Sequence, residues 1–535
     1  MDEPVVISAT SDLHACLADD PARGRIGAAR LKAYLDELRR SARAVFHLDA
    51  GDVFSGHVFG AIDGGRTVAR ALGRLGCRTL TPGNHDFDFS RDENDPLHYV
   101  HALVPLVREQ AGGPLDVLAC NLRWRGGPFP QNVEGPLTLF EEDGFRVRAV
   151  GVACPYSSRP SLAPYIDGCE FEAAEGPDEA PATRARLLEG LERRLAAGAR
   201  PGDAVVVMSH LGEFGARQGR VTGFDLARLS GVALVVDGHS HRRRGPLQVG
   251  RAWYLNCGEG LTAVAEARLR PGRPFVPRLL TYGDLAHVRP DPDLQALTDE
   301  LTARLELAKP LARLPGAFDR RPGGRLGAGS PLSRLICRAL AAAVGADLAF
   351  LNQGALRGGL AGLVTVGDVH EALPFRDEAV SGLLEGEEIW ELLVRLGRKG
   401  PLGLPFHWGV DVYGRAGGVG ERPDDRPSQG LGRRQDDGPE NEPLELAGLI
   451  DAAGRDLRAG GRRRAVFSRQ LAETLALGGL PGRREHGLLA SAVMDGLTRL
   501  SAQELALVER PNLRLFEDLA AARRAWRADL QGRGA

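Results

Sequence analysis

The chain has 535 residues, more than one hydrophobic core usually organises, so we expect two folded domains. Hydrophobic residues make up 43% and charged residues 26%, as in ordinary globular proteins, and no apolar run is long enough to predict a membrane-spanning helix. The formal net charge of -2 argues against a general attraction to nucleic acid or to an anionic membrane. We therefore expect neither among the partners of this protein.

The N-terminus and the cysteines bear on the compartment. Residues 1–4 contain no basic region, and no apolar stretch typical of a signal peptide precedes the strand-like segment that begins at Val5. The seven cysteines include no C-x-x-C pair, which is typical of buried thiols in a reducing compartment. We expect a cytoplasmic protein. The alternative is an exported or periplasmic protein whose N-terminus was trimmed, and the oligomeric state stays open.

Four strand-like segments in the first half of the chain end at polar residues. They cover residues 5–9, 44–49, 204–208 and 232–236. Residues 27–40 and 182–197 lie between these strand-like segments. Apolar residues recur in them at intervals of three and four, which predicts helices. Alternating strands and helices predict an α/β layered domain, in which functional residues gather where the strands end.

Changes in composition predict the domain boundaries. The first domain would cover residues 1–270, ending after the strand-like segment 263–269, because a Pro-rich stretch follows it. A linker over 271–324 would contain an amphipathic helix at 294–307. The second domain would cover 325–500 and the helical tail 501–535. Within the second domain, residues 410–443 are rich in Gly, Arg, Asp and Pro, which predicts a flexible insertion.

Side chains that bind divalent metals follow the predicted strands. They are Asp12, His14, Asp52, Asn84, His210, His239 and His241. A pair of divalent metals needs carboxylate, imidazole and carbonyl-type ligands that converge from separate segments. We expect Asp12 and His14 to share one face of an extended segment, because side chains two residues apart in a strand point the same way. Asp52 follows Gly51, which lets the backbone approach a metal and favours a bridging role for this carboxylate.

Each of these residues also has a simpler explanation when it is taken alone. Asn84 could form a turn, and His210, His239 or His241 could bond a backbone carbonyl group. Five such segments in this order, most of them at the end of a predicted strand, favour a site for two metals. The nearby residues His47, His57, His98 and His101 fit no part of the pattern, and we expect them to be structural.

The full set of motifs resembles the calcineurin-like metallophosphoesterase superfamily. The motifs are Asp12-x-His14, Gly51-Asp52, Gly83-Asn84-His85-Asp86, Ser209-His210 and Gly238-His239-x-His241. The extension through Phe87 to Asp88 resembles the 5'-nucleotidase family within that superfamily. This resemblance implies a four-layer α/β/β/α domain followed by a smaller α+β domain that binds substrate.

The resemblance also implies roles for individual residues. One divalent metal would be held by Asp12, His14, Asp52 and His241, and the other by Asp52, Asn84, His210 and His239. His85 would be catalytic, with Asp88 orienting it. The expected reaction is hydrolysis of a nucleotide or related phosphate ester by attack of a metal-activated water. The ligand set accommodates Mn, Zn, Fe, Co or Ni and does not identify the metal.

Residues 351–375 extend the resemblance into the second domain. An N-x-G-x-x-R segment contains Asn352 and Arg357, and a Pro-Phe pair ends at Phe375. The resemblance implies that Asn352 and Arg357 contact the nucleotide and that Phe375 stacks on its base. In that family a second group of residues further along the chain completes a clamp around the base, and there the sequence departs from the family. Thr474 stands where a second aromatic residue is expected, and Leu480 replaces an aspartate.

These departures leave other functions open. The same metal chemistry could act on a non-nucleotide phosphomonoester, a cyclic nucleotide, a nucleotide sugar or a sulfur analogue. A hypothesis of another class is a binding or scaffold protein in which catalysis is vestigial.

Overall fold

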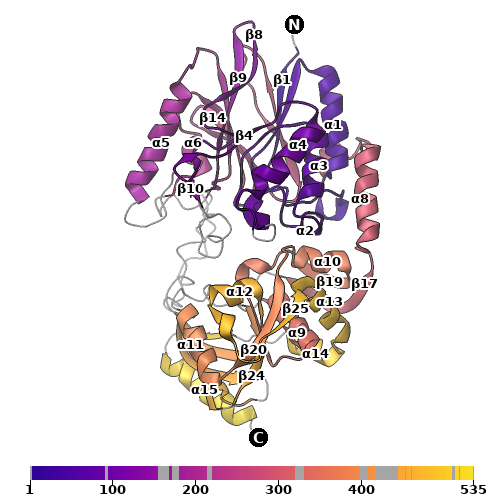
Figure 1. The fold of residues 1–535 in the computed structure, drawn as a ribbon, viewed down its shortest axis with the longest axis vertical. Coiled ribbons are helices and arrows are strands. Elements are labelled where there is room, and N and C mark those ends of the chain that lie inside the picture. The colour runs from indigo at the N-terminus through magenta and orange to yellow at the C-terminus, as the bar shows by residue number, and fades with distance from the viewer. Residues whose placement is uncertain are drawn as a thin grey trace, which may run out of the picture. The chain divides into compact units, whose positions relative to one another are not determined.

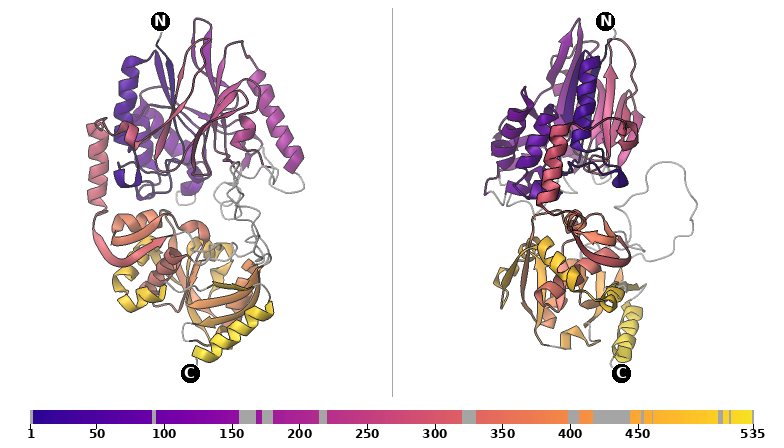
Figure 2. Two further views of the ribbon diagram at one scale, coloured as in Figure 1. Left: turned by 180° about the vertical axis from the view of Figure 1, so that it is seen from behind. Right: turned by 90° about the vertical axis from the view of Figure 1, so that its right-hand side faces the viewer.

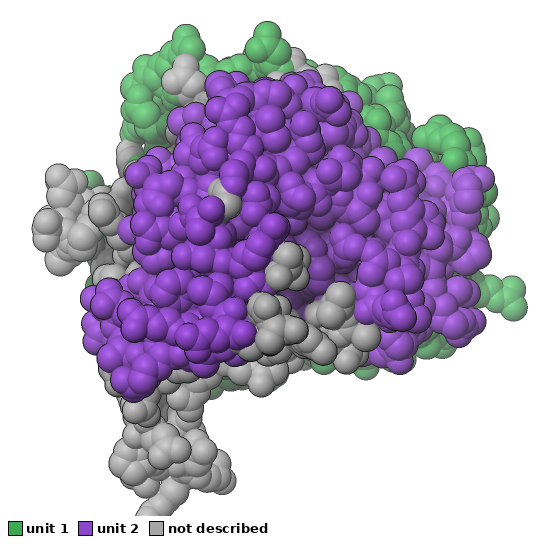
Figure 3. All heavy atoms as spheres, turned by 90° about the horizontal axis from the view of Figure 1, so that it is seen from below, with its two compact units in different colours: residues 1–304 green, residues 305–535 purple. Residues whose placement is uncertain are grey.

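The computed structural model describes most of the chain. The described residues are 3–90, 94–154, 168–171, 180–213, 220–319, 330–397, 406–416, 444–451, 454–459, 461–508, 513–516 and 519–533. The chain forms two compact units, Met1–Arg304 (unit 1) and Leu305–Ala535 (unit 2), which Figure 3 colours separately. No described helix combines the length and the apolar composition that crossing a membrane requires.

Unit 1 contains two large mixed sheets. The first has the order β16-β15-β1-β2-β3-β4-β7, formed by Arg278–Thr281, Ala263–Leu269, Val5–Thr10, Ala44–Asp49, Cys77–Leu80, Asp116–Leu118 and Asn132–Val133. The second has the order β13-β14-β12-β11-β9-β8, formed by Arg243–Val249, Ala252–Cys257, Val232–Asp237, Ala204–Ser209, Phe145–Val152 and Leu137–Glu142. Strands β1, β2 and β3 are parallel to one another, as are β9, β11, β12 and β14.

The two sheets pack face to face, and helices cover their outer faces. Ile7 and Leu48 of the first sheet share a buried core with Val206 of the second. On the other face of the second sheet, Val207 packs with Leu187 of α5 (Ala180–Ala196). Helices α1 (Ala28–Ser41), α3 (Arg66–Arg74) and α4 (Val104–Ala111) lie on the side opposite α5 and α6 (Gly223–Leu226) (Figures 1 and 2). This arrangement confirms the predicted four-layer α/β/β/α domain.

Unit 1 continues past residue 270, where the sequence predicts a boundary. Strand β16 pairs antiparallel with β15, and the helices α7 (Tyr282–Leu285) and α8 (Pro292–Arg304) follow it. The backbone N–H of Asp291, just before α8, donates to the carbonyl of Ala29 at 2.9 Å. Much of the predicted linker therefore belongs to unit 1.

Unit 2 combines helices with antiparallel and mixed sheets, as expected of an α+β domain. Its largest sheet has the order β21-β18-β24-β20-β25, formed by Phe406–Trp408, Leu348–Leu351, Arg463–Ser468, Glu378–Leu384 and Arg484–Leu488. The other strands form the sheets β17-β19 (Pro310–Asp319, Gly359–Thr365) and β23-β22-β26 (Leu444–Asp451, Val410–Ala416, Leu513–Phe516). The α-helices among its described residues are α9 (Pro331–Val344), α10 (Val366–Ala372), α11 (Gly386–Gly397), α12 (Arg469–Thr474), α13 (Leu489–Arg499), α14 (Ala502–Val508) and α15 (Leu519–Arg533).

Two predictions in unit 2 are wrong in part. The first seven residues of the predicted insertion 410–443 form β22, which pairs with β23, while residues 417–443 lie outside the described residues. The predicted helical tail contains α14 and α15, but β26 lies between them and pairs parallel with β22. Because such a pairing joins segments far apart in sequence, local apolar periodicity did not indicate it.

Candidate metal centre

The predicted metal ligands follow five parallel strands at their carboxyl ends. Asp12 and His14 follow β1, Asp52 follows β2, and Asn84 follows β3. His210 follows β11 in the second sheet, and His239 and His241 follow β12. The carboxyl ends of parallel strands lie at one edge of a sheet, so the two packed sheets bring all these loops together.

The side chains form two overlapping groups that could each hold a metal ion. One group consists of Asp12, His14, Asp52 and His241, and the other of Asp52, His210 and His239. Within each group, one potential ligand atom from every residue lies within 4.8 Å of the others, and Asp52 belongs to both. Asn84 joins the second group because its Oδ1 lies 2.8 Å from Nδ1 of His239.

Buried atoms at the centre lack ordinary hydrogen-bond partners. Among the described residues, Oδ2 of Asp12, Oδ2 of Asp52 and Nε2 of His210 are buried without a well-oriented hydrogen bond. The Asp52 and His210 atoms lie 3.0 Å apart. Leaving buried polar atoms unsatisfied is costly, and a bound cation would satisfy these oxygen and nitrogen atoms together. The donor set therefore fits divalent metals such as Zn or Mn.

The backbone at these positions differs from the extended geometry that the sequence suggested. Strand β1 ends at Thr10, and Asp12 and His14 have φ angles of 49° and 47°. The prediction that both lie on one face of an extended segment is wrong. Their backbone N–H groups instead donate to the carbonyls of Gly51 at 2.9 Å and Asp52 at 2.8 Å.

Left-handed backbone recurs around the centre. Asp52, His239 and His241 have φ angles of 56°, 68° and 55°. Such angles are uncommon for residues with a side chain, and they persist where the surrounding structure over-determines them. The loops are held in conformations that point several ligands at one place.

Two glycines allow the loops to approach one another closely. Gly51 has a φ of 97°, and a Cβ there would lie 2.5 Å from the backbone nitrogen of Gly83. A Cβ on Gly238 would lie 2.7 Å from Nδ1 of His210 and 2.9 Å from Oδ2 of Asp12. All three distances are shorter than contact with a carbon atom allows, so a larger residue at either position would displace the neighbouring loop or the ligands.

Burial and neighbouring charges set the protonation of the ligands. Burial, aided by the charge of His241, lowers the pKa of His14 to about 3, so its imidazole is neutral. Burial also opposes protonation of His210, but the carboxylates of Asp52 and Asp12 outweigh it and raise the pKa of His210 to about 10. A metal at Nε2 of His210 would replace that proton, since only neutral imidazole binds metal.

His85 and Asp88 form a pair beside the centre. Nδ1 of His85 lies 2.9 Å from Oδ2 of Asp88, and the Ser55 hydroxyl donates to the same oxygen at 2.7 Å. The backbone N–H of His85 donates to Oδ1 of Asp52 at 2.7 Å. The predicted catalytic histidine is thus adjacent to the candidate bridging carboxylate, and Ser55 is a contact that the sequence did not suggest.

Two further aspartates hold the loops. The Asp86 carboxylate accepts from the backbone N–H groups of Asp52 at 2.9 Å, Val53 at 2.8 Å and Gly83 at 2.8 Å. Oδ1 of Asp237 accepts from three backbone N–H groups, those of Leu211, Gly212 and Gly238. Asp86 stands inside a recognised motif, but nothing in the sequence identified its distant backbone partners.

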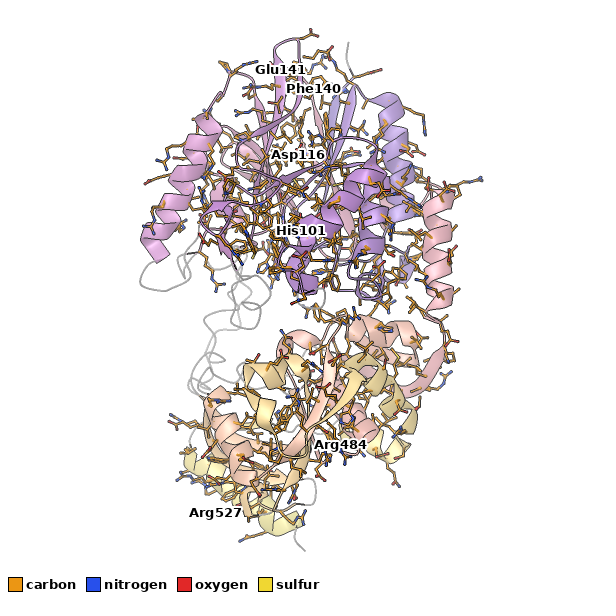
Figure 4. All side chains as sticks on the ribbon, in the orientation of Figure 1. His101, Asp116, Phe140, Glu141, Arg484 and Arg527 are labelled. Atoms are coloured by element: carbon orange, nitrogen blue, oxygen red, sulfur yellow. The ribbon has the colours of Figure 1, made fainter. Side chains whose placement is uncertain are left out.

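The histidines outside the motifs have partners elsewhere. His47 is buried beside the hydroxyls of Ser8 and Thr10, and Nε2 of His98 lies 2.9 Å from the Gly64 carbonyl. Exposed His101 (Figure 4) pairs with Asp95, and His57 accepts from the backbone N–H of Phe59.

In unit 2, the predicted substrate residues fall into two sets of contacts. The Arg357 guanidinium lies over the ring of Phe375, 4.9 Å from its centroid, and donates to the Gly354 carbonyl at 2.7 Å. Asn352 accepts from the Ser468 hydroxyl and donates to Gln470, both at 3.0 Å. Arg357 and Phe375 therefore present one joint surface.

The divergent segment of the clamp takes part in packing. The hydroxyl of Thr474, at the end of α12, donates to the Gln470 carbonyl at 2.8 Å. Leu480 is buried, and a Cβ on Gly382 would lie 2.6 Å from its Cβ. Neither residue offers an aromatic face or a carboxylate to a ligand.

A cavity of about 500 Å³ in unit 1 lies away from this centre. It is lined by Arg39, Phe46 and Cys77, among others. Phe46 and Cys77 stand in the first halves of β2 and β3, whereas the candidate ligands follow the carboxyl ends of these strands.

Comparisons with known proteins agree with these two units. Residues 5–243 match the family described as calcineurin-like phosphoesterase, and residues 315–415 match the 5'-nucleotidase C-terminal domain. The 5'-nucleotidase of Rattus norvegicus is 31% identical over 141 residues, covering 25% of this chain and 22% of the relative. The matched part spans about a fifth of the length of the curated relatives.

Solved structures resemble nearly the whole chain. The 5'-nucleotidase precursor from Thermus thermophilus has a TM-score of 0.64 and 20% identity, covering 96% of this chain and 99% of its own. The sulfate thiohydrolase SoxB from the same species, solved with glycerol, has a TM-score of 0.64 and 17% identity, covering 96% and 97%. At these identities the likeness concerns the fold. The chain thus contains a calcineurin-like phosphoesterase domain followed by a 5'-nucleotidase C-terminal domain.

Proposed function

We propose that the protein is a phosphoric ester hydrolase that uses two divalent metal ions. The observation that carries the proposal is the convergence of seven carboxylate, imidazole and amide side chains, with buried atoms of Asp12, Asp52 and His210 that lack well-oriented hydrogen bonds. Asp12, His14, Asp52 and His241 would hold one ion. The other ion would be held by Asp52, Asn84, His210 and His239.

The metal ions and the side chains of His85 and Asp88 would have separate roles in the reaction. Two divalent ions bound here would activate a water molecule and neutralise charge on the phosphoryl oxygens. Asp88 fixes the orientation of the His85 imidazole through Nδ1, so that Nε2 can face the ester. His85 would then stabilise the transferred phosphoryl group or protonate the departing oxygen.

Replacing His85 tests this assignment. We expect His85→Ala to lower kcat by a factor on the order of hundreds or more, because a positioned acid contributes about 10²–10⁴-fold. Metal content, measured by elemental analysis, should stay at the wild-type value. His101→Ala, which removes an exposed histidine paired with Asp95, is the matched control and should not change kcat. Unchanged turnover in His85→Ala would refute the catalytic role.

We propose a nucleotide as the substrate, with Asn352, Arg357 and Phe375 among its contacts. The matched C-terminal domain and the Arg357 guanidinium over the Phe375 ring support this. An arginine can grip a phosphate, and an aromatic face can stack on a base. Phosphate release from AMP, UDP-glucose, 2',3'-cyclic AMP and p-nitrophenyl phosphate with Mn²⁺ tests the proposal. A generic ester that is cleaved as well as every nucleotide would contradict it.

A sulfur ester is the second candidate substrate. Thr474 and the buried Leu480 stand in place of the expected aromatic and acidic residues of the clamp, and the sulfate thiohydrolase fits the fold as well as the 5'-nucleotidase precursor does. Sulfate release from a thiol-linked sulfonate, with no activity on AMP, would favour this candidate.

The metal content of the purified protein separates the proposed enzyme from a scaffold protein with vestigial catalysis. After reconstitution with Mn²⁺, an enzyme of the proposed type should retain close to two ions per chain. Fewer than about one ion per chain would favour the non-enzymatic function, because the side chains would then not form a metal site.

We also propose that the protein acts in the cytoplasm. Six of its cysteines are buried and Cys169 is half-buried, which fits thiols that serve as small core residues. Fractionation of the native source cells tests this, and recovery in an exported fraction would contradict it.

A further inference from the structure

The histidines around the centre differ in what their second ring nitrogen contacts. Nδ1 of His14 lies 2.9 Å from the Ser55 carbonyl, and Nδ1 of His210 lies 2.6 Å from the Ala50 carbonyl. Nδ1 of His241 instead lies 2.8 Å from Oε2 of Glu259. Two imidazoles therefore donate to neutral backbone oxygens, and one faces a carboxylate.

The turn that carries Glu259 is tied to the candidate ligands. Gly258, Glu259 and Gly260 begin the connection 258–262 between β14 and β15, and the two glycines have φ angles of 79° and 61°. The backbone N–H of Gly260 donates to the carbonyl of Asp12 at 2.8 Å. On the other side, the Thr262 hydroxyl donates to the carbonyl of Glu259 at 2.9 Å. The carboxylate is thus presented by a turn bonded to the backbone of a ligand residue.

We propose that Glu259 is a positioning residue that strengthens one of the two metal positions. It would hold the proton of His241 on Nδ1, so that Nε2 faces Asp12 and His14. This inference rests on the metal centre proposed above and adds that its two positions are supported unequally.

The physical reason is the charge of the acceptor. A carboxylate makes a stronger hydrogen bond than a neutral carbonyl and increases the electron density of the ring that binds the metal. Loss of such a partner typically costs about 10–100-fold in metal affinity. The Glu259 side chain is 52% exposed and that of His241 is 25% exposed. Water screens the pair, so we expect the lower end of that range.

The loss of metal affinity caused by a change at Glu259 should be confined to one of the two metal positions. Nε2 of His241 lies 2.9 Å from Nε2 of His14 and 3.5 Å from Oδ1 of Asp12, within the first group of ligands. The second group contains His210 and His239, whose Nδ1 atoms contact Ala50 and Asn84. A change at Glu259 would leave those contacts intact.

Calorimetric titration of the metal-free full-length protein with Mn²⁺ tests the proposal. For Glu259→Gln we expect about a tenfold weaker affinity at one of two positions, with the other unchanged. The Mn²⁺ concentration for half-maximal turnover should rise, and kcat at saturating Mn²⁺ should return to the wild-type value. Glu142→Gln, which changes an exposed glutamate paired with Arg43, is the matched control and should bind as the wild type does.

Other outcomes separate this inference from the proposed function. Two unchanged affinities, or an equal weakening of both, would overturn the role of Glu259 while leaving the metal centre in place. A lower thermal stability of metal-free Glu259→Gln with both affinities retained would also overturn it, since the residue would then be structural. Wild-type protein that binds no Mn²⁺ would overturn the proposed function itself.

Discussion

Asp86 shows how one side chain can secure the loops that carry the candidate ligands. Its carboxylate accepts hydrogen bonds from the backbone of Gly83 and of three consecutive residues, Asp52 to Phe54. Asp86→Ala would leave these buried donors without an acceptor, at about 1–3 kcal/mol each before relaxation. We expect the free energy of unfolding to fall by about 3–5 kcal/mol, measured in urea.

Asp88→Ala is the comparison for that experiment. Asp88 accepts from the side chains of Ser55 and His85 and has no structural role of comparable extent. It should lower turnover while costing only about 1 kcal/mol of unfolding free energy. Equal stability of the two variants would contradict the role given to Asp86.

His47 predicts a pH dependence of stability that is separate from the metal centre. Burial lowers its pKa from 6.5 to about 3. As the pH falls, the His47 imidazole is protonated in the unfolded chain before it is protonated in the folded one. The contribution of neutral His47 to the free energy of unfolding is therefore complete above pH 6.5 and declines as the pH falls towards 3. From pH 8 to pH 5 the loss should be about 2 kcal/mol.

Replacing His47 isolates that contribution from those of the carboxylates. In His47→Gln, the decrease in unfolding free energy between pH 8 and pH 5 should be smaller than in the wild type by about 2 kcal/mol. Denaturant titration at the two pH values measures it. The same decrease in both proteins would show that His47 does not titrate as proposed.

The sequence could predict the members of the candidate centre because each follows a parallel strand, and the ends of such strands meet. It could not predict the residues that hold the loops or a ligand side chain in place. Asp86 and Glu259 contact atoms far away in sequence, and their side-chain types are ordinary at a turn. The sequence could not predict the φ angles of Asp12 and His14 either, since a D-x-H pattern fits both an extended strand and a left-handed loop.

The close approach of loops across the two sheets depends on glycine. Gly238→Ala would place a Cβ against His210 and Asp12, so we expect metal affinity to fall by at least tenfold as the loop shifts. Gly135→Ala, where a Cβ would meet no atom within 4 Å, is the control and should bind metal normally. Calorimetry on both variants measures this, and retained affinity in Gly238→Ala would contradict the close packing.

Elements defined by local pattern were predicted better than elements defined by distant pairing. The predicted helix 27–40 corresponds to α1 at Ala28–Ser41, and the predicted strand 263–269 coincides with β15. Both have an apolar periodicity of their own. Strand β26 has only four residues and pairs with β22, about a hundred positions earlier, so the local pattern predicts a helical tail there instead.

Each of the two units has its own core. The cores of unit 1 lie between its sheets and under α5, while those of unit 2 surround α9 and β24. We expect a fragment of residues 1–304 to fold, to bind Mn²⁺ and to hydrolyse p-nitrophenyl phosphate. It should lose any preference for AMP, because Arg357 and Phe375 belong to unit 2. A fragment that keeps the AMP preference would place nucleotide recognition in unit 1.

The pairing of β26 with β22 has a consequence for synthesis on the ribosome. Strand β22 ends at Ala416 and its parallel partner begins at Leu513. At about 5–20 residues per second, roughly 100 further residues take on the order of 5–20 s to emerge. Once β23 has followed, β22 has it on one side and an open edge on the other, and such an edge can pair with another chain. A nascent chain that stalls before residue 513 would therefore expose an edge that a chaperone could protect.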